Sequence, residues 1–268
     1  MTGSPNRYTH GHAESVLRSH RWRTAENSAA YLLPRLRPGL SLLDVGSGPG
    51  TITADLAQLV APGRVTALEA TETAIGLTRA ELEQRGIDAD YIVGDVHALE
   101  LPDDTFDVVH AHQVLQHVGD PVQALREMRR VCKPGGIVAA RDGDYHGFCW
   151  YPADPRLDRW MEVYQTVARS NGGEPDAGRR LQAWAREAGF ADVTPSASVW
   201  CHADDVDRDY WGGMWAERVL HSDLARQSVE IGAASQAELE EISSAWREWA
   251  ANPDGWLAIL HGEIIAIA

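Results

Sequence analysis

"LLDVGSGPG", residues 42–50, is the stretch that decides the fold of this chain. A short apolar run contains one acid, Asp44, and then breaks into glycines at every second position, Gly46, Gly48 and Gly50. A buried strand that leads through a glycine-rich turn into a helix is typical of a ligand site at the carboxyl end of a parallel sheet. Glycine there lets a ligand approach the backbone closely. The stretch therefore predicts a strand, a ligand-binding loop and a helix.

The spacing of these glycines bears on which ligand the loop holds. Dinucleotide-binding loops follow the pattern G-x-G-x-x-G, whose third glycine would fall at position 51, where the chain has Thr51. The negative charge of Asp44 at the loop entrance is a poor partner for a pyrophosphate, but it suits a ligand that carries an ammonium and a sulfonium. A nicotinamide-dependent oxidoreductase is therefore the less favoured alternative.

The chain around this loop alternates between apolar strand patterns and helical patterns. Such alternation is typical of a parallel sheet with helices on both faces. We expect strands over 41–46, 64–69, 89–95, 106–111 and 136–142, and helices over 13–36, 49–60, 71–85 and 120–132. Beyond Asp142 we expect helices near 155–170, 179–189, 203–228 and 235–251, and strands over 190–200 and 256–268.

Acids also end the second and third predicted strands. Glu69 follows the second strand, where a carboxylate can accept hydrogen bonds from both hydroxyls of a ribose. Asp95 follows the third strand and is placed to accept from an exocyclic amine such as adenine N6. Either acid alone also suits a helix N-cap or a solvated loop. Three strand-end acids beside one glycine loop favour a nucleoside ligand.

Taken together, four stretches resemble the class I S-adenosylmethionine-dependent methyltransferases, and most of all the ubiquinone/menaquinone-biosynthesis-like group that acts on small molecules. These stretches are "LLDVGSGPGT", "LEA", "GDVHALELPDDTFDVVHAHQVLQHVGDP" and "LREMRRVCKPGG", and the resemblance spans roughly residues 40–142. It implies an α/β fold with a Rossmann-like seven-stranded mixed sheet of order 3-2-1-4-5-7-6, helices on both faces and the last strand antiparallel. The predicted strands 190–200 and 256–268 fit strands six and seven of that sheet.

The resemblance also implies that the cofactor is S-adenosylmethionine and which residues hold it. Gly46 and its neighbours would hold the methionine part, Glu69 the ribose, and Asp95 with the backbone of Val96 the adenine. Related enzymes fold their amino-terminal segment over the cofactor as a lid, so Tyr8 and Arg23 are candidates to contact its carboxylate; a solvated helix face is the alternative for Arg23. The full cofactor-binding set is Tyr8, Arg23, Asp44, Gly46, Ser47, Gly48, Glu69, Ala70, Gly94, Asp95, Val96, His110, His112 and His117.

Histidines near two strand ends are the candidates for a general base, because histidine titrates nearest neutral pH. We select His112 after strand four and His146 after strand five; His117 is a further candidate, although it also suits packing at the start of a helix. Most of the ten tryptophans lie in the second half of the chain, where an aromatic wall suits a planar or hydrophobic acceptor. The predicted acceptor pocket comprises Tyr145, His146, Trp211 and Trp215, whereas Trp160, Trp184, Trp246 and Trp249 are predicted to be core residues that pack against the sheet.

Composition and charge exclude several other classes of protein. The formal net charge of −15 and the lack of a [D/N]-P-P-[Y/F] motif after strand four argue against nucleic-acid substrates. The three cysteines are widely spaced, and no His, Cys and carboxylate cluster indicates a metal. The amino-terminal stretch lacks the apolar core of a signal peptide, and no run is long enough to span a membrane. We therefore expect a cytoplasmic protein without a metal, nucleic-acid or membrane partner; a homodimer is left open.

The sequence thus predicts one methyltransferase domain that transfers a methyl group to an O, N or C nucleophile of a small, aromatic or hydrophobic molecule. The alternative is a catalytically inactive S-adenosylmethionine-binding partner or regulatory protein. The predicted parts of the domain are an amino-terminal helical lid over 1–38, a cofactor-binding core over 39–142, and acceptor-pocket insertions over 145–178 and 203–255.

Overall fold

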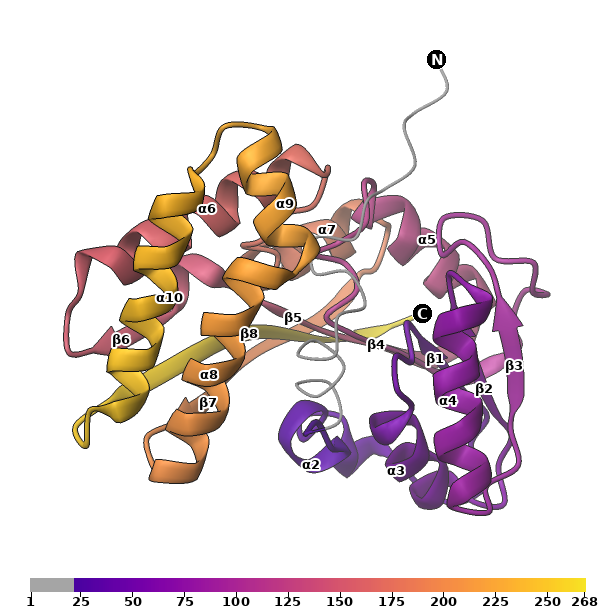
Figure 1. The fold of residues 1–268 in the computed structure, drawn as a ribbon. Helices are drawn as coiled ribbons and strands as arrows, with labels where there is room; N and C mark the ends of the chain where they lie inside the picture. The colour runs from indigo at the N-terminus through magenta and orange to yellow at the C-terminus, as the bar shows by residue number, and fades with distance from the viewer. Residues whose placement is uncertain (1–21) are drawn as a thin grey trace. The chain divides into compact units, whose positions relative to one another are not determined.

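Five apolar stretches in the first half of the chain form parallel strands in the computed structural model, which describes residues 22–268 (Figure 1). Most residues of the central strands are buried between two layers of helices, which is why these runs show little polar alternation. The strands are β1 (Leu42–Val45), β2 (Val65–Glu69), β3 (Asp90–Val93), β4 (Phe106–His112) and β5 (Cys132–Gly143).

The later strands complete the sheet as the sequence predicts. The sheet runs in the order β3-β2-β1-β4-β5-β8, in which β8 (Trp256–Ile267) is antiparallel to β5, and β7 (Asp192–His202) pairs with β8. These two strands are the predicted strands six and seven, so the expected order with an antiparallel last strand is confirmed. The strand order reverses between β1 and β4, which pair directly with Asp44 opposite His110.

By its contacts the chain divides into two compact units, each described here by itself. The described part of the sheet unit comprises residues 22–143, 177–198 and 261–268, and that of the helical unit comprises residues 144–176 and 199–260. The helical unit is built from nearly the same two segments that the sequence marks as insertions.

Helices cover both faces of the sheet in the sheet unit. One face carries α2 (Ala25–Ser28), α3 (Thr51–Val60) and α4 (Glu72–Gln84), and the other carries α5 (Pro121–Val131) and α7 (Leu181–Glu187), which follows the short 3-10 helix η3 (Gly178–Arg180). Local sequence fixes where they begin: Thr71 caps α4 by accepting from the N–H of Ala74, and Asp120 followed by Pro121 begins α5.

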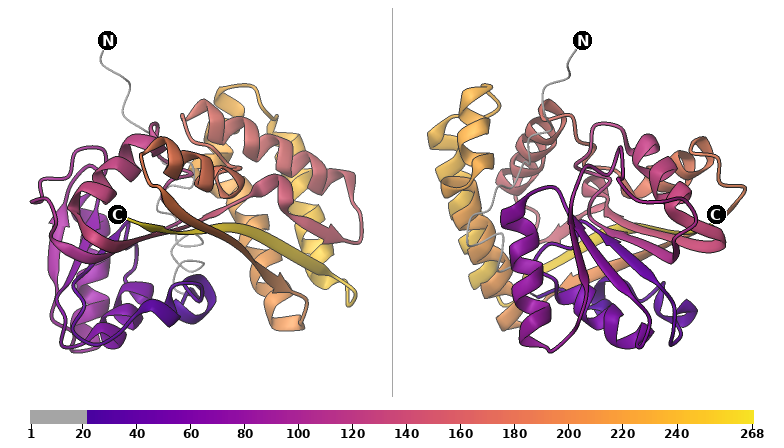
Figure 2. Two further views of the ribbon diagram at one scale, coloured as in Figure 1. Left: turned by 180° about the vertical axis from the view of Figure 1, so that it is seen from behind. Right: turned by 90° about the vertical axis from the view of Figure 1, so that its right-hand side faces the viewer.

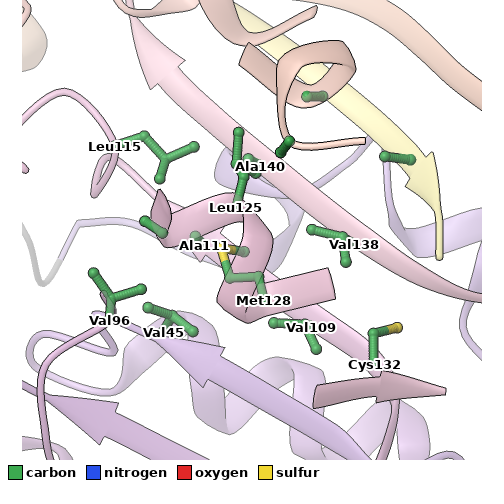
Figure 3. Packing of buried hydrophobic residues seen from close by; sticks show 14 of the residues in the cluster. Val45, Val96, Val109, Ala111, Leu115, Leu125, Met128, Cys132, Val138 and Ala140 are labelled. Carbon is green, nitrogen blue, oxygen red and sulfur yellow. The ribbon is translucent and has the colours of Figure 1, made fainter. Parts of the chain in front are cut away.

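Two apolar clusters hold the sheet unit together. The larger lies between β4, β5 and the helices α5 and α7, and Figure 3 shows Val109, Ala111, Leu125 and Val138 side by side in it. The smaller lies under α2 and α3. Cys132 belongs to the larger cluster, where burial, with the charge of Asp107 as a smaller cause, raises the pKa of its thiol to about 12.

The helical unit is built around an aromatic core. Its helices are α6 (Pro155–Ser170), α8 (Asp205–His221), α9 (Asp223–Glu230) and α10 (Gln236–Ala251), of which the last three are orange to yellow in Figure 2. Trp160 is fully buried, with ring centroids 4.6 Å from Trp215 and 4.9 Å from Trp246, both in edge-to-face contact. The unit also contains the short 3-10 helix η2 (Tyr145–Gly147) and the strand β6 (Cys149–Tyr151), which pairs with residues 256–258 of β8.

Three local expectations were wrong in detail. In the described part of 13–36 the chain forms only α2 and the 3-10 helix η1 (Leu33–Arg35), because the helix ends after Ser28 and Pro34 begins a new turn. The single helix over 203–228 is split at Ser222, whose extended backbone and side chain cap α9. Strand β6 was missed because three residues show no periodicity. None of the helices described is long and apolar enough to cross a membrane.

Candidate functional site

The glycine loop between β1 and α3 has the backbone conformation that its sequence predicts. Gly46, Gly48 and Gly50 all have positive φ, at 69°, 57° and 87°, a region that residues with a Cβ rarely adopt. A Cβ on Gly46 would lie 2.4 Å from Cγ2 of Val114, whereas a Cβ on Gly48 would meet no atom within 4 Å. The loop therefore packs tightly against the turn after β4 but is open beside Gly48, where a ligand can approach.

Asp44 at the loop entrance is buried and bound by the protein itself. One carboxylate oxygen lies 2.7 Å from Nδ1 of His110 and the other accepts from the hydroxyl of Thr53 at 2.5 Å. Both carboxylate oxygens of this β1 residue are thus bound by side chains of β4 and α3. Because Nδ1 of His110 faces a carboxylate it carries the proton, which leaves Nε2 as an acceptor. That Nε2 is buried and has no hydrogen-bond partner among the described residues.

Glu69 lies at the carboxyl end of β2 and is tied to the glycine loop. Its Oε1 accepts from the backbone N–H of Gly48 at 2.6 Å, and its Oε2 accepts from the N–H of Ala70 at 3.2 Å. The N–H of Gly94 in turn donates to the carbonyl of Glu69 at 2.9 Å. The carboxylate therefore lies beside the open position at Gly48, where ribose hydroxyls can donate to it.

Asp95 and Val96 follow β3 and differ in exposure. Asp95 keeps 68% of its side chain exposed and accepts from the backbone N–H of His97 at 2.9 Å, which lowers the pKa of its carboxyl group. Val96 is buried in the larger apolar cluster. The predicted adenine contact of these two residues stays a prediction.

Two of the predicted histidines, His112 at the end of β4 and His117 in the turn after it, have lowered pKa values. Burial, followed by the charge of Arg141, holds the pKa of His112 well below its usual range. Burial and the charge of Arg23 lower the pKa of His117 to about 3. Arg23 therefore lies near both histidines, and its predicted contact with the cofactor carboxylate stays a prediction. Tyr8 lies outside the described residues.

A row of polar side chains on β5, β7, β8 and the turn after β4 was missed by sequence reasoning. Arg141 is fully buried and its Nε donates to Oε1 of Glu263 at 3.2 Å; the same carboxylate accepts from Ser196 at 2.8 Å and from Ser198 at 2.5 Å. His261 lies 2.9 Å from the amide nitrogen of Gln113. The sequence did carry a signal for buried polar residues, because charged residues occur inside two otherwise apolar strand patterns, "IVAARDG" and "HGEIIAIA".

Asp142 fixes the turn that follows β4. Its Oδ1 accepts from the N–H of Gln116 at 3.0 Å, and Oε1 of Gln116 accepts from the N–H of Gly143 at 2.8 Å. This reciprocal pair holds residues 113–117 on β5. Burial raises the pKa of Asp142 to about 8, although the backbone N–H of Gln116 and the charge of Arg141 act in the opposite direction.

We expect the Asp142→Asn substitution to flatten the dependence of stability on pH. Between its ordinary value of 3.8 and about 8 the folded protein keeps a proton that the unfolded chain releases, so the free energy of unfolding falls as pH rises through this range, by up to about 1.4 kcal/mol per pH unit. Urea unfolding at pH 5, 6, 7 and 8 would measure how the free energy of unfolding of each protein depends on pH. Asparagine is the suitable replacement because its side-chain oxygen can still accept from the N–H of Gln116. Parallel curves for the two proteins would show that Asp142 ionises normally.

Aromatic residues of the predicted acceptor pocket lie in the interior of the helical unit. Tyr145 is stacked between Phe148 and Tyr164, with ring centroids at 4.4 and 4.0 Å. Trp211 and Trp215 are 5% and 3% exposed. Of the predicted core tryptophans, Trp160, Trp246 and Trp249 are buried, as expected, but within the helical unit; Trp184 packs against the larger cluster of the sheet unit.

His146 is the most exposed of the predicted site residues in the helical unit, with 58% of its side chain accessible. Its Nδ1 lies 2.6 Å from Oδ2 of Asp176, and its backbone N–H donates to Oδ1 at 2.9 Å. Burial raises the pKa of Asp176, but hydrogen bonds from His146 and Gln165 outweigh it and leave the pKa at about 2. A carboxylate on Nδ1 selects the tautomer in which Nε2 is the base.

No group of three or more metal-ligating side chains that could hold an ion occurs in residues 22–268. What the sheet unit offers instead is a loop open at Gly48, a carboxylate after β2 and an exposed carboxylate after β3. These groups lie at the carboxyl edge of the sheet, beside the reversal of strand order, and fit a nucleoside that carries an amino acid.

Comparisons with known proteins agree with this geometry. Residues 43–140 match a family model described as a methyltransferase domain. An uncharacterized methyltransferase of Schizosaccharomyces pombe is 33% identical over 96% of this chain and 95% of its own, and a probable methyltransferase of Aspergillus luteorubrus is 30% identical over 99% and 98%. A ubiquinone/menaquinone biosynthesis C-methyltransferase of Hydrogenovibrio crunogenus is 33% identical over 60% of this chain and 69% of its own.

Solved structures share the fold at lower identity. The YcgJ protein of Bacillus subtilis superimposes with a TM-score of 0.61 at 18% identity and covers 90% of this chain and 98% of its own. A phosphoethanolamine N-methyltransferase of Haemonchus contortus gives a TM-score of 0.54 at 17% identity, over 89% of this chain and 52% of its own.

Proposed function

Because this chain belongs to the family of class I S-adenosylmethionine-dependent methyltransferases, we propose that it methylates an O, N or C nucleophile of a small, aromatic or hydrophobic molecule. The observation that carries the cofactor assignment is the Glu69 carboxylate, held on the N–H of Gly48 beside the open side of the glycine loop. A catalytically inactive binding protein is not favoured.

The bound cofactor supplies a methyl group that is already activated on a sulfonium. The residues of this chain therefore bind and orient the reactants and exclude water more than they activate the donor. In the proposal the glycine loop holds the amino-acid part, Glu69 accepts from the ribose hydroxyls, and Asp95 with the backbone of Val96 holds the adenine. Arg23, the backbone around His110 to Gln113, and His117 contribute the remaining contacts.

The acceptor class is proposed from charge and from relatives. A net charge of −15 disfavours a polyanionic substrate. Relatives with named reactions are described as ubiquinone/menaquinone biosynthesis C-methyltransferases, and a structural neighbour as a phosphoethanolamine N-methyltransferase. The same charge, with three widely spaced cysteines, supports the proposal of a cytoplasmic protein that needs no nucleic-acid or membrane partner.

A transfer assay with methyl-labelled S-adenosylmethionine tests this function. The acceptor panel should contain hydroquinones, phenols, small amines and, as a contrast, RNA and DNA oligonucleotides. We expect label in at least one aromatic or hydrophobic small molecule. Label in nucleic acid alone would overturn the acceptor class, whereas tight cofactor binding without transfer to a broad panel would favour the inactive binding protein.

Proton removal from the acceptor is proposed for His112 or His146. A positioned base contributes about 10²–10⁴-fold, so we expect His112→Ala or His146→Ala to lower kcat at least about tenfold while the Kd for S-adenosylmethionine hardly changes. His221→Ala, an exposed histidine on α8, is the matched control. If catalysis depends on the His146 tautomer that Asp176 selects, Asp176→Asn should lower kcat as His146→Ala does. Full turnover of both histidine variants from pH 6 to 9 would exclude a histidine base.

A further inference from the structure

Thr78 lies on α4 and its hydroxyl reaches the glycine loop. The residue is fully buried. Its Oγ1 donates to the carbonyl oxygen of Gly48 at 2.7 Å and lies 2.8 Å from the hydroxyl of Ser47. Since the single proton of Thr78 is used on the carbonyl, the Ser47 hydroxyl is the donor to Thr78. The result is one continuous hydrogen-bonded chain from Ser47 through Thr78 to Gly48.

This chain completes the anchoring of the loop backbone. The N–H groups of Gly46 and Ser47 donate to the carbonyl of Leu68 at 2.8 and 3.3 Å, and the N–H of Gly48 donates to Glu69 at 2.6 Å. The carbonyl of Gly48 is held only by Thr78 in the described structure. Thr78 therefore contributes, together with the fixed φ of Pro49, to the orientation of the peptide that follows Gly48.

The backbone of α4 approaches the same loop closely. A Cβ added to Gly50 would lie 3.0 Å from Cα and 3.1 Å from the carbonyl oxygen of Thr78. Gly50, with a positive φ of 87°, is thus both a conformational requirement of the loop and the contact surface for α4. Thr78 thus touches the loop in two ways, by packing against Gly50 and by its hydrogen bond to Gly48.

We propose that Thr78 is a positioning residue for the cofactor, which sets the orientation of the Gly48 peptide and so the affinity for the amino-acid part of S-adenosylmethionine. The inference rests on the glycine loop being the cofactor loop of the proposed function. A loop that is fixed before binding loses less conformational freedom when the ligand arrives. Without the hydroxyl, the Gly48 carbonyl loses its one side-chain donor, while the N–H anchors of Gly46, Ser47 and Gly48 remain.

The test compares isosteric and conservative variants by calorimetric binding. We expect Thr78→Val to raise the Kd for S-adenosylmethionine and for S-adenosylhomocysteine about tenfold each, because the hydrogen bond from the buried Thr78 hydroxyl to the Gly48 carbonyl is lost. An equal effect on both is expected because the two ligands share the amino-acid part. Thr78→Ser, which keeps the hydroxyl, should bind like the parent. Ser47→Ala should have a smaller effect than Thr78→Val, because it leaves the bond to Gly48 in place.

The controls separate positioning from general destabilisation. Thr66→Val makes the same chemical change at another buried threonine, on β2, and should leave both Kd values unchanged. Circular dichroism confirms that each variant is folded at the temperature of the titration. Parental affinity of a folded Thr78→Val protein would overturn the role of Thr78. Failure of the unsubstituted protein to bind either ligand would instead overturn the cofactor assignment.

Discussion

The Glu69→Ala variant is expected to bind S-adenosylmethionine more weakly than the parent by about 1–3 kcal/mol, or roughly 5- to 150-fold in Kd. The substitution removes the carboxylate that the ribose hydroxyls would meet. It also removes the acceptor for the N–H of Gly48, at 2.6 Å, so the loop loses one of its anchors as well. Both losses act in the same direction, which makes this the largest effect on binding that we expect from one side chain.

Asp95→Ala is the matched comparison for Glu69→Ala. Its carboxylate is more exposed, and the backbone at Val96 can still hold an adenine, so the loss of affinity should be smaller. Isothermal calorimetry with S-adenosylmethionine and S-adenosylhomocysteine measures both variants. If Glu69→Ala is folded and binds with parental affinity, Glu69 is not the ribose ligand.

The Glu263→Ala variant is expected to lose about 3–5 kcal/mol of stability, because it leaves the buried guanidinium of Arg141 without its carboxylate. Arg141 is fully buried, and burial lowers its pKa to about 10, so it stays charged at neutral pH. Ser196 and Ser198 lose their common acceptor in the same change. Urea unfolding at pH 7 gives the free energy of unfolding directly.

A double variant separates the stability contributed by the ion pair of Arg141 and Glu263 from that contributed by the packing of their side chains. Replacing both charges, as in Arg141→Met with Glu263→Leu, should restore most of the lost stability, since a buried ion pair often exchanges for apolar residues at little cost. If Glu263→Ala unfolds at the same urea concentration as the parent, the buried pair contributes little. If the double variant is as unstable as Glu263→Ala, packing rather than charge explains the loss.

The sheet was predictable because its central strands β1 and β4 are almost entirely buried. Runs such as 106–111 and 136–142 are mostly apolar, and strand order then followed from the family resemblance. The glycine loop was predictable for a similar reason, since three closely spaced glycines have few uses other than positive φ and close approach.

The hydrogen-bond partners of the site residues were not predictable from the sequence. Asp44 was expected to place its charge toward the ligand, yet His110 and Thr53 occupy both of its oxygens. Thr78 looks in the sequence like any polar residue of an amphipathic helix, and its role depends on which loop α4 packs against. Such contacts join residues far apart in the chain, so periodicity carries no signal for them.

The unequal burial of the three cysteines makes this chain convenient for chemical labelling. Cys132 is buried in the sheet unit with a thiol pKa of about 12, so it holds almost no thiolate at neutral pH, whereas Cys149 and Cys201 are exposed and both belong to the helical unit. A maleimide dye should therefore react with the helical unit alone, without any prior cysteine substitution. Its fluorescence would report on that unit separately from the unit that carries the glycine loop.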